Sequence, residues 1–175
     1  LTPKEYFLVT AHRQENVDEK ETLESILNGL ELVHNEFSLP IIYPIHPRTS
    51  KRLKEFGLKV NGVDFINPLG YLEFLQLEAN AKLVLTDSGG IQEEACILGV
   101  PCVTLRDNTE RPETVEVGSN ILAGTNRESI LKGVRKMSNR QTLKKFDQNA
   151  SLNGKNPFGD GTAGKRVIKI LERVI

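Results

Sequence analysis

The sequence contains no tryptophan, one methionine and two cysteines among its 175 residues. Cys96 and Cys102 lie six positions apart, which is not a metal-ligand spacing, and two cysteines do not make the disulfide framework of a small secreted domain. We therefore expect both to be buried small apolar residues. The three histidines form no cluster with the cysteines, so a structural zinc ion is not expected.

Net charge and long hydrophobic runs are also missing. The 23 Lys and Arg residues balance 23 Asp and Glu residues, so nothing draws the surface towards nucleic acid or an anionic membrane. No apolar run approaches the roughly 20 residues that span a bilayer. Because residues 1–5 lack the apolar core of a signal peptide, a cytoplasmic protein is the default expectation. The missing initiator methionine suggests a chain cut from something longer.

Short apolar runs alternate with segments of helical spacing along the whole chain. Strands are predicted at 6–11, 41–45, 63–66, 83–86, 101–105 and 120–123, and helices at 21–37, 47–56, 71–80, 91–98, 112–117, 127–137 and about 161–175. A polar, loop-rich stretch covers about 138–160. The alternation predicts one Rossmann-like domain over 1–175, with a largely parallel sheet between helices in a three-layer α/β/α arrangement. No GxGxxG follows the first strand, which argues against NAD in its usual mode.

A turn of small residues, Ser88-Gly89-Gly90, separates the strand at 83–86 from the helix that follows. This order is typical of a phosphate site, because glycines let a ligand approach the backbone and the first N–H groups of a helix have no internal partners. Glu94 lies one helical turn beyond Gly90, close enough to reach hydroxyls on whatever carries the phosphate. The alternative is an ordinary turn in which Ser88 is the N-cap.

Four motifs follow one another over essentially the whole chain: Thr10-Ala11-His12-Arg13-Gln14-Glu15-Asn16, Thr86-Asp87-Ser88-Gly89-Gly90-Ile91-Gln92-Glu93-Glu94, Arg106-Asp107-Asn108-Thr109-Glu110-Arg111-Pro112-Glu113 and Asn156-Pro157-Phe158-Gly159-Asp160-Gly161. Any one of them is a weak signal. Together and in this order they resemble the non-hydrolysing UDP-N-acetylglucosamine 2-epimerases.

The resemblance implies two Rossmann-like domains facing a cleft, as in GT-B glycosyltransferases, with this chain as the C-terminal one. It implies interconversion of UDP-N-acetylglucosamine and UDP-N-acetylmannosamine for cell-surface polysaccharide synthesis. The family eliminates UDP to leave 2-acetamidoglucal and then adds UDP back, with neither NAD nor a catalytic metal. The carboxylates that move the proton at carbon 2 belong to the N-terminal domain. This chain alone is therefore expected to bind UDP weakly and to epimerise nothing, and the full-length protein to be a homodimer.

For the leaving group, the resemblance assigns Ser88, Gly89 and Gly90 to the diphosphate of UDP. Arg111 is placed among the UDP contacts, which suits a guanidinium. The alternative for Arg111 is an ion pair with Glu110 or Glu113 on a solvated turn.

For the nucleoside, Glu94 resembles the family's ribose-binding carboxylate; the alternative is an ordinary exposed helix glutamate, which is our interpretation of Glu93. Phe74 resembles the apolar contact at the uracil, whereas its spacing alone favours a core residue. Only main-chain contacts near Leu69 and Gly70 are carried over, because the family tolerates a polar side chain at the position of Leu69.

His12 is the one catalytic candidate in the chain. At the end of a strand, its imidazole can donate to the β-phosphate or exchange a proton with the leaving group, and a reference pKa of about 6.5 suits either task. His34 has no motif around it and is interpreted as a packing residue. In some bacterial members a second UDP-N-acetylglucosamine binds beside the active site as an activator, and the resemblance places Arg13 and His46 at that site.

Four other functions remain open at this point. They are an epimerase of a modified sugar such as a UDP-diacetamido-uronic acid, a GT-B glycosyltransferase, a hydrolysing epimerase that releases free N-acetylmannosamine, and a non-catalytic nucleotide-binding module. Residues 156–161 are expected to form a tight turn that caps the last helix. Part of that helix's apolar stripe is expected to be exposed, because in two-domain relatives such a helix crosses back to the first domain.

Overall fold

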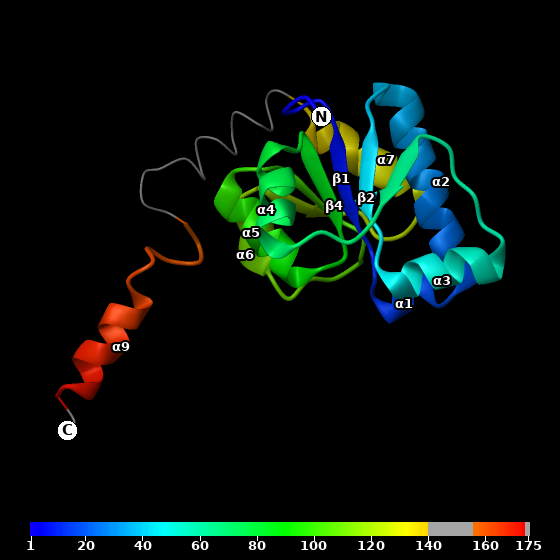
Figure 1. Ribbon diagram of the computed structural model, residues 1–175. Helices are drawn as coiled ribbons and strands as arrows, with labels where there is room; N and C mark the ends of the chain where they lie inside the picture. Colours follow the sequence, from blue (N-terminus) through cyan, green and yellow to red (C-terminus); the bar gives the residue numbers. More distant parts are fainter. Residues whose placement is uncertain (140–155, 174–175) are drawn as a thin grey trace.

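Six short strands form a single parallel sheet in the order β3-β2-β1-β4-β5-β6 (Figure 1). The computed structural model describes residues 1–139 and 156–173. The strands are β1 Phe7–Thr10, β2 Ile41–Pro44, β3 Val63–Ile66, β4 Leu83–Thr86, β5 Cys102–Thr104 and β6 Asn120–Leu122. The helices are α1 Gln14–Val17, α2 Lys20–Phe37, α3 Pro47–Phe56, α4 Tyr71–Asn80, α5 Gly89–Leu98, α6 Pro112–Glu116, α7 Arg127–Met137 and α9 Ala163–Leu171.

The inner strands β2, β1, β4 and β5 are buried on both faces almost throughout, because they are predominantly apolar, whereas the edge strands β3 and β6 are partly exposed. On β1, Phe7 and Val9 belong to a core shared with α2 and α7, whereas Leu8 points to the opposite face, towards α4 and α5. This alternation follows from the two-residue period of a strand. Figure 1 shows the resulting layers, with α2 and α7 on one side of the sheet and α4 and α5 on the other. The predicted three-layer Rossmann-like fold is confirmed.

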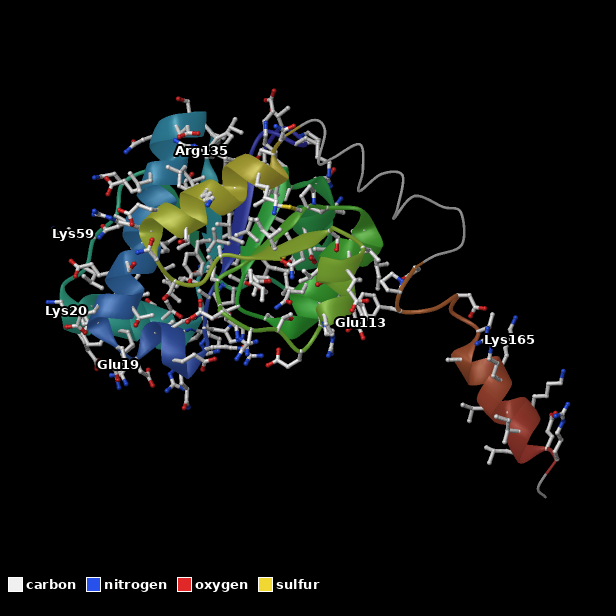
Figure 2. All side chains as sticks on the ribbon, turned by 180° about the vertical axis from the view of Figure 1, so that it is seen from behind. Glu19, Lys20, Lys59, Glu113, Arg135 and Lys165 are labelled. Atoms are coloured by element: carbon white, nitrogen blue, oxygen red, sulfur yellow. The ribbon has the colours of Figure 1, made fainter. Side chains whose placement is uncertain are left out.

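Helices α2 and α7 pack against each other at a glycine. A Cβ added at Gly29 of α2 would lie 2.9 Å from Cδ1 of Ile130 on α7, so the two helices approach more closely than a larger residue allows. Figure 2 shows α7 beside α2, with Arg135 near its end, where its guanidinium pairs with Glu36. This layer closes one face of the sheet and leaves the strand ends open.

Most predicted elements are confirmed, with strand ends trimmed by one or two residues. Helix α1 was not predicted, because the HRQEN segment was interpreted only as polar residues after a strand. Cys96 and Cys102 are buried free thiols, as expected. Residues 140–155 of the polar stretch lie outside the described residues. Among the described helices, none is both long enough and apolar enough to cross a membrane.

The last helix confirms the expected exposed stripe. Its apolar residues Val167, Ile168, Ile170 and Leu171 are each more than half exposed. The preceding turn is tight, since the Gly159 N–H donates to the Asn156 carbonyl at 3.0 Å. Asp160 accepts from the Thr162 N–H at 3.0 Å, at the start of α9.

Candidate functional site

The predicted site residues follow the carboxyl ends of adjacent parallel strands, at the lower edge of the sheet in Figure 1. His12 follows β1, His46 follows β2 and Ser88 follows β4. Chain order reverses between β1 and β4, because β2 lies on one side of β1 and β4 on the other. In open α/β sheets this switch point is where ligands bind.

A pocket of about 250 Å³ opens at this edge. It is lined by Thr10, Ala11, His12, Tyr43, Pro44, His46, Pro68, Leu69, Phe74, Ser88 and Ile91. The structure thus brings His12, Phe74 and Ser88 together around one hollow, with His46 among the lining residues. The other predicted residues do not line this pocket: Gly89, Gly90 and Glu94 lie on α5, and Arg13 and Arg111 directly precede α1 and α6.

Asp87, which the sequence analysis did not identify as a site residue, is the buried hydrogen-bond acceptor that holds the segment containing His12 in place. Its side chain is fully buried, and Oδ2 accepts from the backbone N–H groups of His12 and Arg13, each at 2.9 Å, and from Asn16 Nδ2 at 3.1 Å. Oδ1 lies 3.4 Å from His12 Nδ1. One buried carboxylate therefore holds the backbone of His12 by a hydrogen bond and lies close to its ring. In the tautomer with its proton on Nδ1, the ring directs that proton to Oδ1 and keeps the lone pair of Nε2 for a ligand.

The start of α5 combines a capped helix end with free donors. Ser88 Oγ accepts from the Ile91 N–H at 3.5 Å, and the Ser88 N–H donates to Thr86 Oγ1 at 3.0 Å. The N-cap interpretation of Ser88 is therefore confirmed. Capping uses the hydroxyl as an acceptor, so its proton remains available for a ligand. The N–H groups of the first helical turn have no helical partner, and the helix dipole favours an anion there.

Three arginines beside this helix end are paired with carboxylates. Arg106, which is buried, donates to Glu110 at 2.7 Å, and Arg13 lies 3.0 Å from the same carboxylate. The hydrogen bond from Arg106 is the main reason why the pKa of Glu110 falls to about 2. Arg111 donates from Nε to Glu93 at 2.9 Å.

Two expectations about this cluster were wrong. The carboxylate partner of Arg111 is Glu93 on the facing helix and neither Glu110 nor Glu113, because the turn folds back over α5; Glu110 contributes only its backbone carbonyl. Glu93 is accordingly a half-buried, ion-paired residue and not an ordinary exposed one.

The 106–113 turn is held against α5 by a buried amide that the sequence analysis missed. Gln92 is fully buried, and its Oε1 accepts from Thr109 Oγ1 and, at 3.2 Å, from Asn120 Nδ2. Nothing in the local sequence marks Gln92, since its partners lie 17 and 28 residues away. Its effect is to fix Arg111 beside the start of α5.

Helices α4 and α5 hold the residues assigned to the nucleoside. Glu94 accepts from the Tyr71 hydroxyl at 3.3 Å, so it faces α4. Phe74 packs against the core and also lines the pocket, so the two interpretations of Phe74 are compatible. Leu69 lines the same hollow just before α4.

The two residues assigned to a second ligand point in different directions. The rings of His46 and His12 have their centroids 5.8 Å apart, and His46 Nδ1 accepts from the Arg48 N–H at 3.2 Å as the N-cap of α3. Arg13 turns instead towards Glu110. His34 Nδ1 donates to the Leu39 carbonyl at 3.0 Å, and the side chain is half-buried, in line with a packing role. Within the described residues, no group of three or more His, Cys, Asp or Glu side chains is placed to hold a metal.

A family model described as UDP-N-acetylglucosamine 2-epimerase matches residues 1–172. The chain belongs to this family. The UDP-N-acetylglucosamine 2-epimerase of Methanocaldococcus jannaschii is 56% identical over 172 residues, a match that covers 95% of this chain and 44% of that protein. The chain thus spans slightly less than half the length of this relative.

A solved epimerase structure from the same organism, described as a complex with UDP-GlcNAc and UDP, superposes with a TM-score of 0.83 at 54% identity. The match covers 96% of this chain and 45% of that one. A UDP-2,3-diacetamido-2,3-dideoxy-D-glucuronate 2-epimerase of Pseudomonas aeruginosa is 38% identical, covering 97% of this chain and 45% of that protein. The epimerase family therefore includes relatives with different sugar substrates.

Proposed function

We propose that this chain is the C-terminal, UDP-binding half of a cytoplasmic UDP-N-acetylglucosamine 2-epimerase. The complete enzyme interconverts UDP-N-acetylglucosamine and UDP-N-acetylmannosamine by eliminating UDP and adding it back through 2-acetamidoglucal, for cell-surface polysaccharide synthesis. The observation that carries the proposal is the meeting of His12, fixed by buried Asp87, and Ser88 at one pocket at the switch point of the sheet.

Elimination expels a diphosphate, so negative charge develops on the leaving group. The free N–H groups at the start of α5 and the Ser88 hydroxyl supply fixed donors for that charge, and fixed donors need no reorganisation during the reaction. The same contacts keep UDP bound for the return step. His12 lines the pocket, where Nε2 takes a proton from the leaving group or, once both ring nitrogens carry protons, donates to the β-phosphate.

Arg111 joins this site by exchanging partners. A diphosphate offers a guanidinium a bidentate acceptor of higher charge than the carboxylate of Glu93. We infer that UDP draws Arg111 away from Glu93 and towards the phosphates. Glu94 then accepts from the ribose hydroxyls, and Phe74 contacts the uracil beside the backbone of Leu69 and Gly70.

The remaining parts of the enzyme lie outside this chain in the proposal. The carbon-2 acid and base are carboxylates of an N-terminal domain, and the exposed apolar stripe of α9 packs on that domain, within a homodimer. His46 borders the pocket beside His12, which supports an activator site there more directly than the position of Arg13 does.

The chain is expected to bind UDP weakly and to show no epimerisation, because it holds the leaving group and not the reacting carbon. Titration calorimetry with UDP tests the binding. Turnover of UDP-N-acetylglucosamine by this chain, compared with that by a full-length epimerase, tests whether catalysis at carbon 2 requires the N-terminal domain. Detectable epimerisation by the 175 residues contradicts the proposal.

A modified sugar is the second candidate substrate, favoured by the 38% identical diacetamido-glucuronate epimerase. The full-length protein assayed with both UDP-sugars distinguishes the two. Sugar transfer to an acceptor identifies a glycosyltransferase, release of free N-acetylmannosamine identifies a hydrolysing epimerase, and nucleotide binding without turnover identifies a regulatory module.

A further inference from the structure

Helix α4 carries a buried carboxyl group beneath the proposed ribose site. Glu78 is 0% exposed, and neither of its carboxyl oxygens accepts a hydrogen bond from residues 1–139 and 156–173. A charged carboxylate in such a place is far less favourable than a neutral carboxyl. Burial, followed by the nearby charge of Glu94, raises the pKa of Glu78 to about 8. Burial without a donor thus favours the protonated, neutral form of Glu78 at neutral pH.

The groups around Glu78 leave one acceptor for its proton. Glu94, on the neighbouring helix α5, is the nearby charge that acts on it. Tyr71, on the same helix as Glu78, already donates to Glu94 at 3.3 Å. The buried Cys102 thiol of β5 is close enough for the charge of Glu78 to act on it, and burial is the main reason why the pKa of that thiol is raised as well. The Lys4 ammonium bonds to two backbone carbonyls at the end of α4, at 2.8 and 3.0 Å.

We propose that Glu78 is a positioning residue whose carboxyl proton is hydrogen-bonded to Glu94 and holds that carboxylate in place for the ribose hydroxyls. The inference rests on the proposed function, since Glu94 is assigned to the ribose there. An ionised carboxylate has about four acceptor sites. With the Tyr71 hydroxyl and the Glu78 carboxyl on one side of Glu94, the remaining sites face the nucleotide.

Loss of this proton has a defined consequence. Two neighbouring carboxylates within a partly buried site repel each other, and Glu94, the more exposed of the two, then turns away into solvent. UDP can then bind only by restoring Glu94 to its position. Because coupling between two binding sites is reciprocal, UDP binding also increases the affinity of Glu78 for its proton.

The experiment compares UDP affinity at about pH 7 and about pH 9 in the wild-type chain and in Glu78→Gln. The glutamine amide donates to Glu94 at every pH and so imitates the protonated state. One coupled proton weakens wild-type binding about tenfold more than variant binding over this range. Glu78→Met, which has no donor, is expected to bind UDP weakly at both pH values. The phosphate and uracil groups of free UDP ionise in the same way whichever protein is present, so their own pH dependence cancels when the three proteins are compared.

Two further measurements keep the outcomes distinct. Glu94→Ala is expected to weaken UDP binding and to leave inorganic pyrophosphate binding, which involves no ribose, unchanged. If Glu94→Ala binds UDP normally, the ribose assignment fails and this inference fails with it. If Glu94→Ala weakens UDP but wild type and Glu78→Gln have parallel pH profiles, only the role of Glu78 is overturned.

Calorimetry on the wild-type chain alone provides the second readout, which does not depend on how well Glu78→Gln folds. UDP binding measured above about pH 8 in buffers of different ionisation enthalpy is expected to show net proton uptake by the protein. Heats that match the titration of UDP alone overturn the proposal.

Discussion

Replacing Gly89 with valine is expected to weaken UDP binding by about a hundredfold. Gly89 begins α5, where the free N–H groups would meet the diphosphate. A Cβ there would lie 3.4 Å from Glu110 Oε2, which is ordinary contact. The two methyl groups of valine extend beyond this Cβ and would occupy space above the helix end that the diphosphate needs. The loss of two or three hydrogen bonds to a charged ligand, about 3 kcal/mol in all, corresponds to this factor.

The same substitution should leave the fold intact, which separates binding from folding. Gly89 has a helical backbone, and valine has a higher helix propensity than glycine. Gly89→Ala is the matched control, because its single Cβ at 3.4 Å is an ordinary contact and it should retain most of the affinity. Calorimetry and circular dichroism on both variants check this. A folded Gly89→Val chain that binds UDP like the wild type removes the diphosphate from this turn.

The order of strands and helices could be predicted because it depends on local patterns. Buried parallel strands are continuous apolar runs, and the helices carry apolar residues at intervals of three and four. The limits were less accurate. The strand predicted to begin at Pro101 begins at Cys102, and proline has no N–H to donate to a ladder. The position of β1 at the centre of the sheet follows from long-range packing that these patterns do not contain.

In the site, too, features with a local sequence signal could be predicted, and features that depend on long-range contacts could not. Ser88 was identified because a turn of small residues between strand and helix is a local signal, and its N-cap role follows from the same signal. Arg111 was recognised as a cation, but its partner Glu93 was not, because the ion pair depends on how the turn folds over α5. Glu78 was not identified from the sequence, where α4 carries several polar residues, and only the structure shows that it is buried near Glu94.

Asp87 illustrates the limit most directly. Its donors on His12, Arg13 and Asn16 are 71 to 75 residues away in sequence. A sequence signal did exist: an acidic residue directly after a strand as apolar as residues 83–85 has no place in the core unless it is hydrogen-bonded. That observation predicts a buried acceptor at position 87 but does not identify its partners.

Replacing Asp87 with alanine is expected to lower the free energy of unfolding by about 3 kcal/mol, since a buried donor left without an acceptor costs about 1–3 kcal/mol. Three donors lose their acceptor together: the N–H groups of His12 and Arg13, and the Asn16 side chain. Water can enter beside the 44%-exposed His12 side chain and accept from some of these donors. The expected total is therefore close to the cost of one unsatisfied donor and below the sum for three. Urea denaturation of the wild-type and variant chains measures the difference.

Asp87→Asn is the matched control, and it tests the two oxygens of Asp87 separately. The amide oxygen of asparagine can still accept the bonds now made to Oδ2, so most of the stability should remain. Its NH₂ group, however, would face His12 Nδ1 in place of Oδ1 and would require the ring to accept a hydrogen bond there, which moves the ring proton to Nε2. Asp87→Asn is therefore expected to fold nearly as well as the wild type and to shift the imidazole ¹⁵N resonances of His12. If Asp87→Asn is as unstable as Asp87→Ala, the backbone contacts at Oδ2 are not what Asp87 contributes. If Asp87→Asn leaves the His12 resonances unchanged, Asp87 does not orient the ring.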